Sequence, residues 1–226
     1  MSQYNIAVLL YPGADALDFT GPVEIFSAVL SGRSLSAPAV FHSTTFALAS
    51  PVTAASGPLT LTPNATLVQV RERLEDFDVL VVPGAGPQVI TDLITSEDGK
   101  QVLDLIKRFA GLEPRSAHRV LLSVCTGSVI LGAAGVLGGK EATTHHMFYD
   151  MLSEVSAKAG GKVELVKERR WVDAGFNEAG VRIVTAGGVS SGMDASLYVV
   201  EKMVGKDAAD LAGEIVEFES RQEVVV

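Results

Sequence analysis

The segment from His118 to Gly135 changes abruptly from a strand pattern into a helix pattern. An apolar run ends at Val124, and small residues with helical apolar spacing begin at Gly127. Cys125, the only cysteine of the chain, lies between them. This arrangement is typical of a nucleophile elbow, a tight strand-to-helix turn that presents one side chain at the end of a sheet. We therefore expect an α/β fold with a reactive position at the sheet edge.

A thiol at this turn would point at the N-terminal end of the following helix. The helix dipole and the free backbone N–H groups there favour the thiolate, which is the reactive form of cysteine. We therefore expect Cys125 to be ionised and exposed. The alternative is a buried cysteine that only fills space, which is the usual role of a lone cysteine. The elbow segment alone leaves both interpretations open.

Strand and helix patterns alternate along the rest of the chain. Apolar and β-branched runs predict strands, and apolar residues at helical spacing predict helices. Strands are expected over 4–10, 40–48, 59–62, 77–82, 120–124, 163–166, 170–172 and 181–185. Helices are expected over 98–112, 147–159, 191–204 and 208–218. Two further helices are expected to begin at Pro22, with Thr20 or Gly21 as cap, and at Gly127. The alternation implies a mostly parallel sheet with helices on both faces. No linker is visible, so residues 1–226 are expected to form a single domain.

Composition limits the classes of partner and compartment. The 226 residues are 47% hydrophobic, which suffices for one large buried core. A formal net charge of −9 argues against a nucleic-acid partner. No apolar stretch has the length needed to cross a membrane, and the N-terminus lacks the positive segment of a signal peptide. A single cysteine allows no internal disulfide, so we expect a reducing, cytoplasmic setting.

Three loops should meet at the edge of the sheet where the strands end: 11–20, 83–87 and 125–127. Ligands of such sheets lie beyond the carboxyl ends of the strands. Asp18 is flanked by the apolar residues Leu17 and Phe19, so we expect its pKa to be raised and its proton to be available near the thiol. The alternative for Asp18 is that it only caps a helix.

Backbone N–H groups near the thiol are candidates for stabilising developing negative charge. Gly84, Ala85 and Gly86 offer such groups without bulky side chains, and we expect them to form an oxyanion or substrate site. The N–H groups of Thr126 and Gly127 are expected beside the sulfur. This set supplies donors for nucleophilic catalysis.

The sequence does not support a metal or nucleotide site. Residues 84–89 begin like a dinucleotide fingerprint but lack its third glycine, and 138–141 resemble a phosphate loop only superficially. Adjacent side chains on a strand point in opposite directions, so His145 and His146 should not share one metal. We expect no metal and no organic cofactor. Trp171 and the Arg169–Arg170 pair are expected on the sheet surface or at an oligomer contact.

Several motifs together resemble the ThiJ/PfpI superfamily over nearly the whole chain. The resemblance implies a flavodoxin-like, class I glutamine amidotransferase-like three-layer sandwich with a mostly parallel sheet. Within the superfamily the chain is most similar to the isonitrile hydratase branch, which pairs a Cys-Thr-Gly elbow with a Leu-Asp-x-Thr-Gly-Pro loop. The motifs are Ser123 to Ser128, Leu17 to Pro22, Val82 to Gly84, Leu137 to Lys140, Ala142 to His145 and Gly187 to Asp194.

The resemblance implies specific roles. Cys125 would be the nucleophile, Asp18 its carboxylate partner and Thr126 a neighbour lining the site, in a hydro-lyase that converts a small-molecule isonitrile into an N-substituted formamide through a thioimidate. Family members are usually homodimers. The loop over 83–87 is shorter than in similar hydratases, and the loop from Asp173 to Gly180 is expected to be extended.

Other functions remain open at this point. Peptidases, deglycases and glyoxalases of the superfamily carry a histidine directly after the cysteine, whereas Thr126 stands there in this chain. A redox or stress sensor would use reversible oxidation of Cys125. A ligand-binding module is the third alternative, because the superfamily fold also occurs in transcription regulators.

Overall fold

Seven strands form the central sheet in the order β10–β11–β7–β6–β1–β2–β5. The computed structural model describes residues 3–32, 34, 36–55, 57, 59–114 and 118–222. Five of the six neighbouring strand pairs are parallel, and only β10 runs antiparallel to β11. The expected α/β fold with a mostly parallel sheet is confirmed. The strands are β1 (Tyr4–Leu9), β2 (Phe41–Ala47), β5 (Ala65–Thr66), β6 (Val79–Val82), β7 (Val120–Ser123), β10 (Trp171–Phe176) and β11 (Arg182–Ala186).

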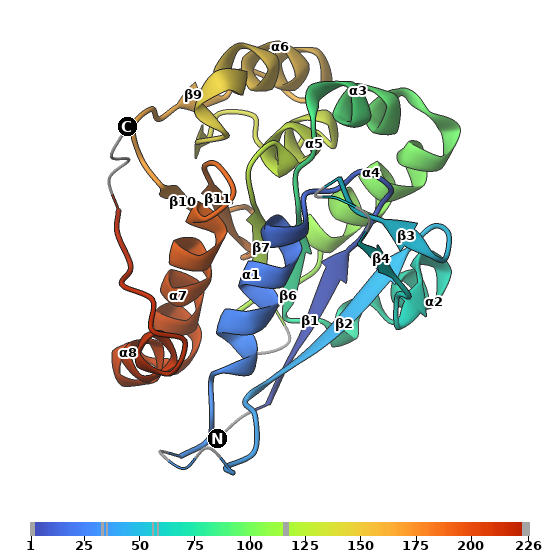
Figure 1. The fold of residues 1–226 in the computed structure, drawn as a ribbon. Coiled ribbons are helices and arrows are strands. Elements are labelled where there is room, and N and C mark those ends of the chain that lie inside the picture. The colour runs from blue at the N-terminus through green and yellow to red at the C-terminus, as the bar shows by residue number, and fades with distance from the viewer. Residues whose placement is uncertain are drawn as a thin grey trace.

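Helices cover both faces of this sheet, which gives three layers (Figure 1). On one face α1, α7 and α8 pack together, and on the other α3, α4 and α5 form a second group with α6 lying against α5. All residues of β6 and β7 are buried between the two helical layers. The helices are α1 (Ala16–Ser27), α2 (Leu67–Glu72), α3 (Pro87–Thr95), α4 (Glu97–Ala110), α5 (Gly127–Ala133), α6 (Tyr149–Ala159), α7 (Ser191–Val204) and α8 (Lys206–Ile215).

Two small sheets lie outside the central one. Strand β3 (Val52–Thr53) pairs antiparallel with β4 (Thr60–Leu61), which is the short peripheral strand expected from the sequence. Strand β8 (Glu141–Ala142) pairs in parallel with β9 (Glu164–Leu165). In the described part of the chain, no helix has both the length and the apolar character needed to cross a membrane.

Helix α1 begins earlier than the sequence predicted. Its first residue is Ala16, so Pro22 lies inside the helix and Thr20 does not cap it. The Thr20 hydroxyl instead donates a hydrogen bond to the Ala16 carbonyl one turn earlier, at 2.7 Å. Tertiary burial of Asp18 and Phe19 outweighs the local start signal at Pro22. The early start places Asp18 in the first turn of α1 rather than in a loop.

Helices α2 and α3, the short strands β3 and β5, and an extension of β10 were not predicted from the sequence. The expected loop over 173–180 is a strand as far as Phe176. Strand β10 carries an irregularity between Asp173 and Phe176, where Gly175 has a φ of +70°. This bulge hides the two-residue alternation that would otherwise indicate a strand.

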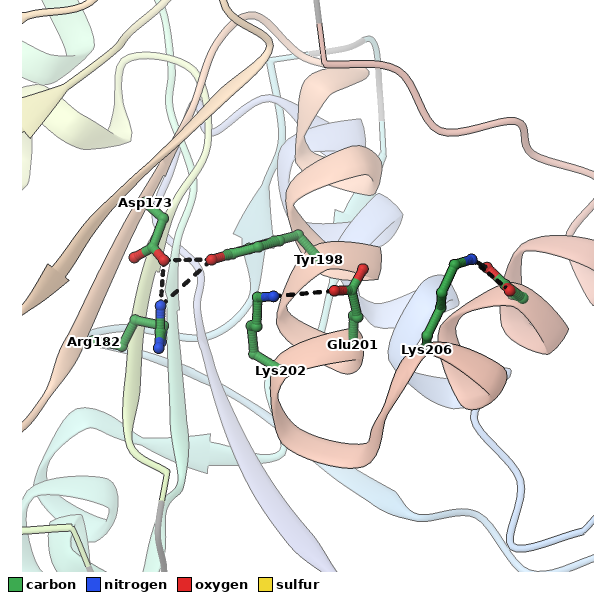
Figure 2. Close-up of polar contacts among 7 residues, drawn as sticks. Asp173, Arg182, Tyr198, Glu201, Lys202 and Lys206 are labelled. Carbon is green, nitrogen blue, oxygen red and sulfur yellow. Dashed lines mark hydrogen bonds and ion pairs between the residues drawn. The ribbon is translucent and has the colours of Figure 1, made fainter.

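The expected surface position is wrong for Arg170, which is buried and forms a 2.6 Å ion pair with the fully buried Asp194. Nearby, Asp173 accepts hydrogen bonds from Arg182 and Tyr198, and these contacts tie β10, β11 and α7 together (Figure 2). Trp171 stacks on the Tyr198 ring with centroids 4.0 Å apart. This part of the molecule therefore serves the packing of α7 on the sheet.

Candidate functional site

The carboxyl ends of β1, β6 and β7 bring the three predicted loops together. Ala14, after β1, forms an isolated bridge with Ala85, after β6. The Asp15 N–H donates to the Gly84 carbonyl at 2.9 Å, and the Val124 N–H donates to the Val82 carbonyl at 3.0 Å. Backbone hydrogen bonds thus join loops that are far apart in the sequence, and Cys125 lies where they meet.

The backbone of Cys125 has a left-handed conformation with a φ of +57°. A non-glycine residue rarely adopts this conformation unless its surroundings hold it there. The Cys125 N–H donates to the Gly187 carbonyl at 2.8 Å, and its carbonyl accepts the hydroxyl hydrogens of Thr144 at 3.0 Å and Ser128 at 3.3 Å. These contacts hold the Cys125 backbone in this sharp turn, as in a nucleophile elbow.

The environment of the thiol differs from the exposed, ionised state that the sequence predicted. Cys125 is only 3% exposed, and burial raises its pKa to about 12, helped by the nearby Asp18 carboxylate. Hydrogen bonds from the backbone N–H groups of Val189 and Thr126 to the sulfur oppose this shift without overcoming it. The sequence predicted a lowered Cys125 pKa, and this direction is wrong, because desolvation raises the pKa by more than the helix N-terminus lowers it.

Asp18 is fully buried and lies beside the thiol. Its Oδ2 accepts the Gly84 N–H at 2.9 Å, whereas Oδ1 has no hydrogen-bond partner among the described residues. Burial raises its pKa to about 7; the Gly84 N–H and the thiol oppose the shift, and Asp15 adds to it. The capping alternative fails, because the N-cap position of α1 is Asp15. Asp18 can therefore exchange a proton near neutral pH.

Thr126 connects the elbow to the loop after β6. Its buried hydroxyl donates to the Ala85 carbonyl at 2.7 Å and accepts the Ala85 N–H at 2.9 Å. Since its backbone N–H hydrogen-bonds the sulfur, Thr126 holds both the loop and the nucleophile. The side chain itself is directed at the loop.

Most of the N–H groups expected to hold an oxyanion already have partners. Gly84 donates to Asp18, Ala85 donates to Thr126, and Gly127 donates to the Val124 carbonyl at 2.9 Å. Gly86 is the N-cap of α3. The donors that face the sulfur are Thr126, which was predicted, and Val189, which was not. Only the fold brings the loop after β11 to the thiol, so no local pattern marked Val189.

Asp15 is a site residue that the sequence interpretation missed. One carboxylate oxygen of Asp15, one of Asp18 and the sulfur of Cys125 all lie within 4.8 Å of one another. Asp15 and Asp18 are three residues apart, which places them on one side of the first helical turn, and this spacing was the available signal. A metal held by these groups would need a deprotonated thiol. In this arrangement burial raises the pKa of the Cys125 thiol, which opposes that deprotonation.

His145 and Tyr11 complete the surroundings. His145 interacts electrostatically with Asp15, and its ring stacks on His146 with centroids 4.5 Å apart. The expectation that the two histidines point in opposite directions is wrong, because His146 starts a 3₁₀ helix (His146–Phe148) instead of continuing a strand. The buried Tyr11 hydroxyl donates to the Pro83 carbonyl at 2.8 Å. Its pKa is raised by burial and by the charges of Asp18 and Cys125.

Comparison with known proteins identifies relatives of this chain. The chain is 33% identical over 210 residues to isonitrile hydratase of Pseudomonas putida, covering 92% of this chain and 75% of the relative. It is 28% identical over 135 residues to protein DJ-1 homolog A of Arabidopsis thaliana, covering 59% of this chain and 29% of that protein.

Solved structures share the fold. A ThiJ/PfpI family protein from Pseudomonas syringae superposes with a TM-score of 0.74 at 26% identity, covering 98% of this chain and 77% of that one. Drosophila melanogaster DJ-1beta superposes with a TM-score of 0.71 at 18% identity, covering 97% of this chain and 100% of that one. The model of the DJ-1/PfpI family matches residues 4–202. With its elbow cysteine on a parallel α/β sheet, this chain belongs to the DJ-1/PfpI family.

Proposed function

We propose that this protein hydrates isonitriles to N-substituted formamides, with Cys125 as nucleophile and Asp18 as its proton-transfer partner. The observation that carries the proposal is a buried thiol beside a buried carboxyl whose pKa is raised to about 7. The 33% identity to an isonitrile hydratase supports the same reaction. A small-molecule substrate and the absence of a cofactor are part of the proposal, since the terminal carbon of an isonitrile is itself electrophilic.

A protonated thiol suits this chemistry better than a free thiolate. The terminal carbon of an isonitrile must gain both a sulfur and a hydrogen in the first step. The Cys125 S–H bond breaks, the sulfur bonds to that carbon, and the proton passes through Asp18 to the same carbon. The product is a thioimidate, R–N=CH–S–Cys125, and no net charge is created in the buried site. A low dielectric environment favours such a charge-conserving step.

The second half of the reaction adds water to the thioimidate carbon. The resulting tetrahedral adduct bears a hydroxyl group, the nitrogen substituent and the sulfur. When its C–S bond breaks, the hydroxyl oxygen forms the formamide carbonyl and a proton returns to Cys125. The N–H groups of Thr126 and Val189 face the sulfur and are placed to stabilise negative charge on it as it leaves.

The proposal is tested by assaying formamide production from a simple aryl or alkyl isonitrile. Cys125→Ala is expected to abolish production above the uncatalysed rate, and Cys125→Ser, which keeps the shape of the side chain, is expected to be nearly as inactive. The oxygen of serine is a far weaker nucleophile than sulfur unless a strong base activates it. Unchanged production by Cys125→Ala would refute the role of the sulfur.

The alternatives receive less support from the site. Peroxide oxidation requires a thiolate, and a buried thiol with a raised pKa is a poor redox sensor. A glyoxalase or deglycase reaction of the type that uses a histidine after the cysteine lacks that residue, because Thr126 occupies the position.

We also propose a homodimer and a cytoplasmic location. Leu17 is 40% exposed on α1, and a Cβ added at Gly21 of the same helix would contact both Leu17 and Met193 of α7. The surface formed by these two packed helices is where we expect a second copy to bind. The single cysteine is compatible with a reducing compartment.

A further inference from the structure

Asp15 is a carboxyl of the site that the proposed mechanism leaves unused. It occupies the N-cap position of α1, yet its side chain makes no capping hydrogen bond. One of its oxygens lies within 4.8 Å of both an Asp18 oxygen and the Cys125 sulfur. Asp15 is half-buried, whereas Asp18 is fully buried. Asp15 is therefore the more solvent-accessible of the two carboxyl groups beside the thiol.

The proton balance of thioimidate hydrolysis requires two transfers. The oxygen of water bonds to the thioimidate carbon of R–N=CH–S–Cys125. Of the two hydrogens of water, one must end on the nitrogen and the other on the sulfur. Asp18 lies beside the sulfur, and its Oδ1 has no other partner among the described residues. A second acid–base group that is more accessible to water than Asp18 would serve the nitrogen. General acid–base groups must lie within hydrogen-bond reach of the proton that they move, directly or through one water.

Burial and neighbouring titratable groups act on the pKa of Asp15 in opposite directions. Asp18 and Cys125 face it within the cluster, and Tyr11 and His145 interact with it electrostatically. Burial raises the Asp15 pKa, and His145 opposes that shift. Burial also lowers the His145 pKa, which favours a neutral ring, with His146 acting in the same direction.

We propose that Asp15 is a second catalytic acid–base group, which accepts a proton from the attacking water and delivers it to the thioimidate nitrogen. The O–H bond of water breaks as its oxygen bonds to carbon, the C=N bond becomes a single bond, and the nitrogen gains the proton from Asp15. Asp18 then returns the remaining hydroxyl proton to sulfur as the C–S bond breaks. This inference rests on the proposed isonitrile hydration.

The test separates the two halves of the reaction. Asp15→Asn keeps the size of the side chain but cannot accept a proton, so the first step should proceed and hydrolysis should slow by about 100-fold. Intact-protein mass spectrometry after mixing with an alkyl isonitrile should then detect the Cys125 adduct in Asp15→Asn but not in the wild type. Asp15→Glu should restore part of the turnover. Asp104→Asn, an exposed change on α4, is the matched control and should behave like the wild type.

Two outcomes would overturn the role of Asp15 alone. Turnover of Asp15→Asn at the wild-type rate would do so, as would a loss of adduct formation equal to the loss of hydrolysis. By contrast, a wild type that forms neither adduct nor formamide would overturn the proposed function itself.

A second measurement needs no isonitrile. Removing the Asp15 charge should lower the Cys125 pKa, so Asp15→Asn should react with iodoacetamide severalfold faster than the wild type at pH 8. Equal alkylation rates in the wild type, Asp15→Asn and Asp104→Asn would show that Asp15 does not act on the thiol. That result would contradict the placement of the Asp15 carboxylate beside the thiol, on which the inference depends, whatever the substrate.

Discussion

At the scale of single residues, burial decides the chemistry of this site. Asp18 and Cys125 lie side by side out of water, and the pKa of each is raised. The sequence predicted the raised Asp18 pKa from its apolar neighbours, but it predicted an ionised thiol from the helix dipole. The second prediction failed because a dipole can be recognised from a turn motif, whereas the depth of burial depends on every element that packs over the turn.

The buried Asp18 should reduce stability as pH rises. Its pKa is about 7 in the folded protein and near 3.9 when unfolded, so the folded state binds the proton more tightly. Stability from this group is therefore greatest below the unfolded pKa and falls as pH rises toward 7. Asp18→Asn should be more stable than the wild type at pH 8, by about 1–4 kcal/mol.

Urea unfolding at pH 5 and pH 8 measures this difference. Most of the gain should disappear at pH 5, where Asp18 is largely protonated in the folded wild type. An equal stability difference at the two pH values would show that Asp18 does not titrate near neutral pH. Activity should change differently from stability. Asp18→Asn should lose most of its activity at both pH values, because Asp18 has a proposed role in proton transfer.

At the scale of elements, the loops after β6 and β7 can pack closely because residue 84, which lies against Thr126, is a glycine. A Cβ added at Gly84 would lie 2.6 Å from both the nitrogen and the Oγ1 of Thr126 and 2.9 Å from Asp18 Oδ2. The sequence suggested that the glycines of this loop leave room for a ligand. In the structure, Gly84 leaves room for the elbow backbone, so its role is in assembling the site.

Gly84→Ala should therefore push the loop away from the elbow. We expect a loss of about 1–3 kcal/mol in the free energy of unfolding, as for other overpacked sites, together with a fall in activity. Gly86→Ala is the matched control, because a Cβ there meets nothing within 4 Å and its φ is −58°. Chemical denaturation of both variants checks the expectation; similar losses in the two variants would contradict it.

At the scale of the whole molecule, the parallel sheet makes one site from distant segments. The loops after β1, β6, β7 and β11 all end at the same edge, because parallel strands share one direction. The sequence predicted three of these loops at the site. It missed the contribution of the fourth, which supplies the Val189 N–H, and it missed helix α3 between β6 and α4.

Association can be checked on the intact chain. A homodimer should have twice the 23.7 kDa mass of one chain in light scattering coupled to size-exclusion chromatography. Apolar burial on α1 and α7 would provide the free energy for association. A mass of 23.7 kDa at every concentration up to about 100 µM would contradict the proposed dimer. A dimer with a dissociation constant below about 100 µM would be populated in that range.

The sequence by itself determined the α/β class and the position of the elbow at Cys125, and it indicated Asp18 as a carboxyl near the thiol, because these depend on local patterns of apolar and small residues. The tertiary structure alone decided that burial raises the pKa of the thiol, that Gly84 and Ala85 hold the site together, and that Asp15 and Val189 lie near the sulfur. Proton affinity and hydrogen-bond partners depend on burial and on contacts between distant segments, which no local pattern records.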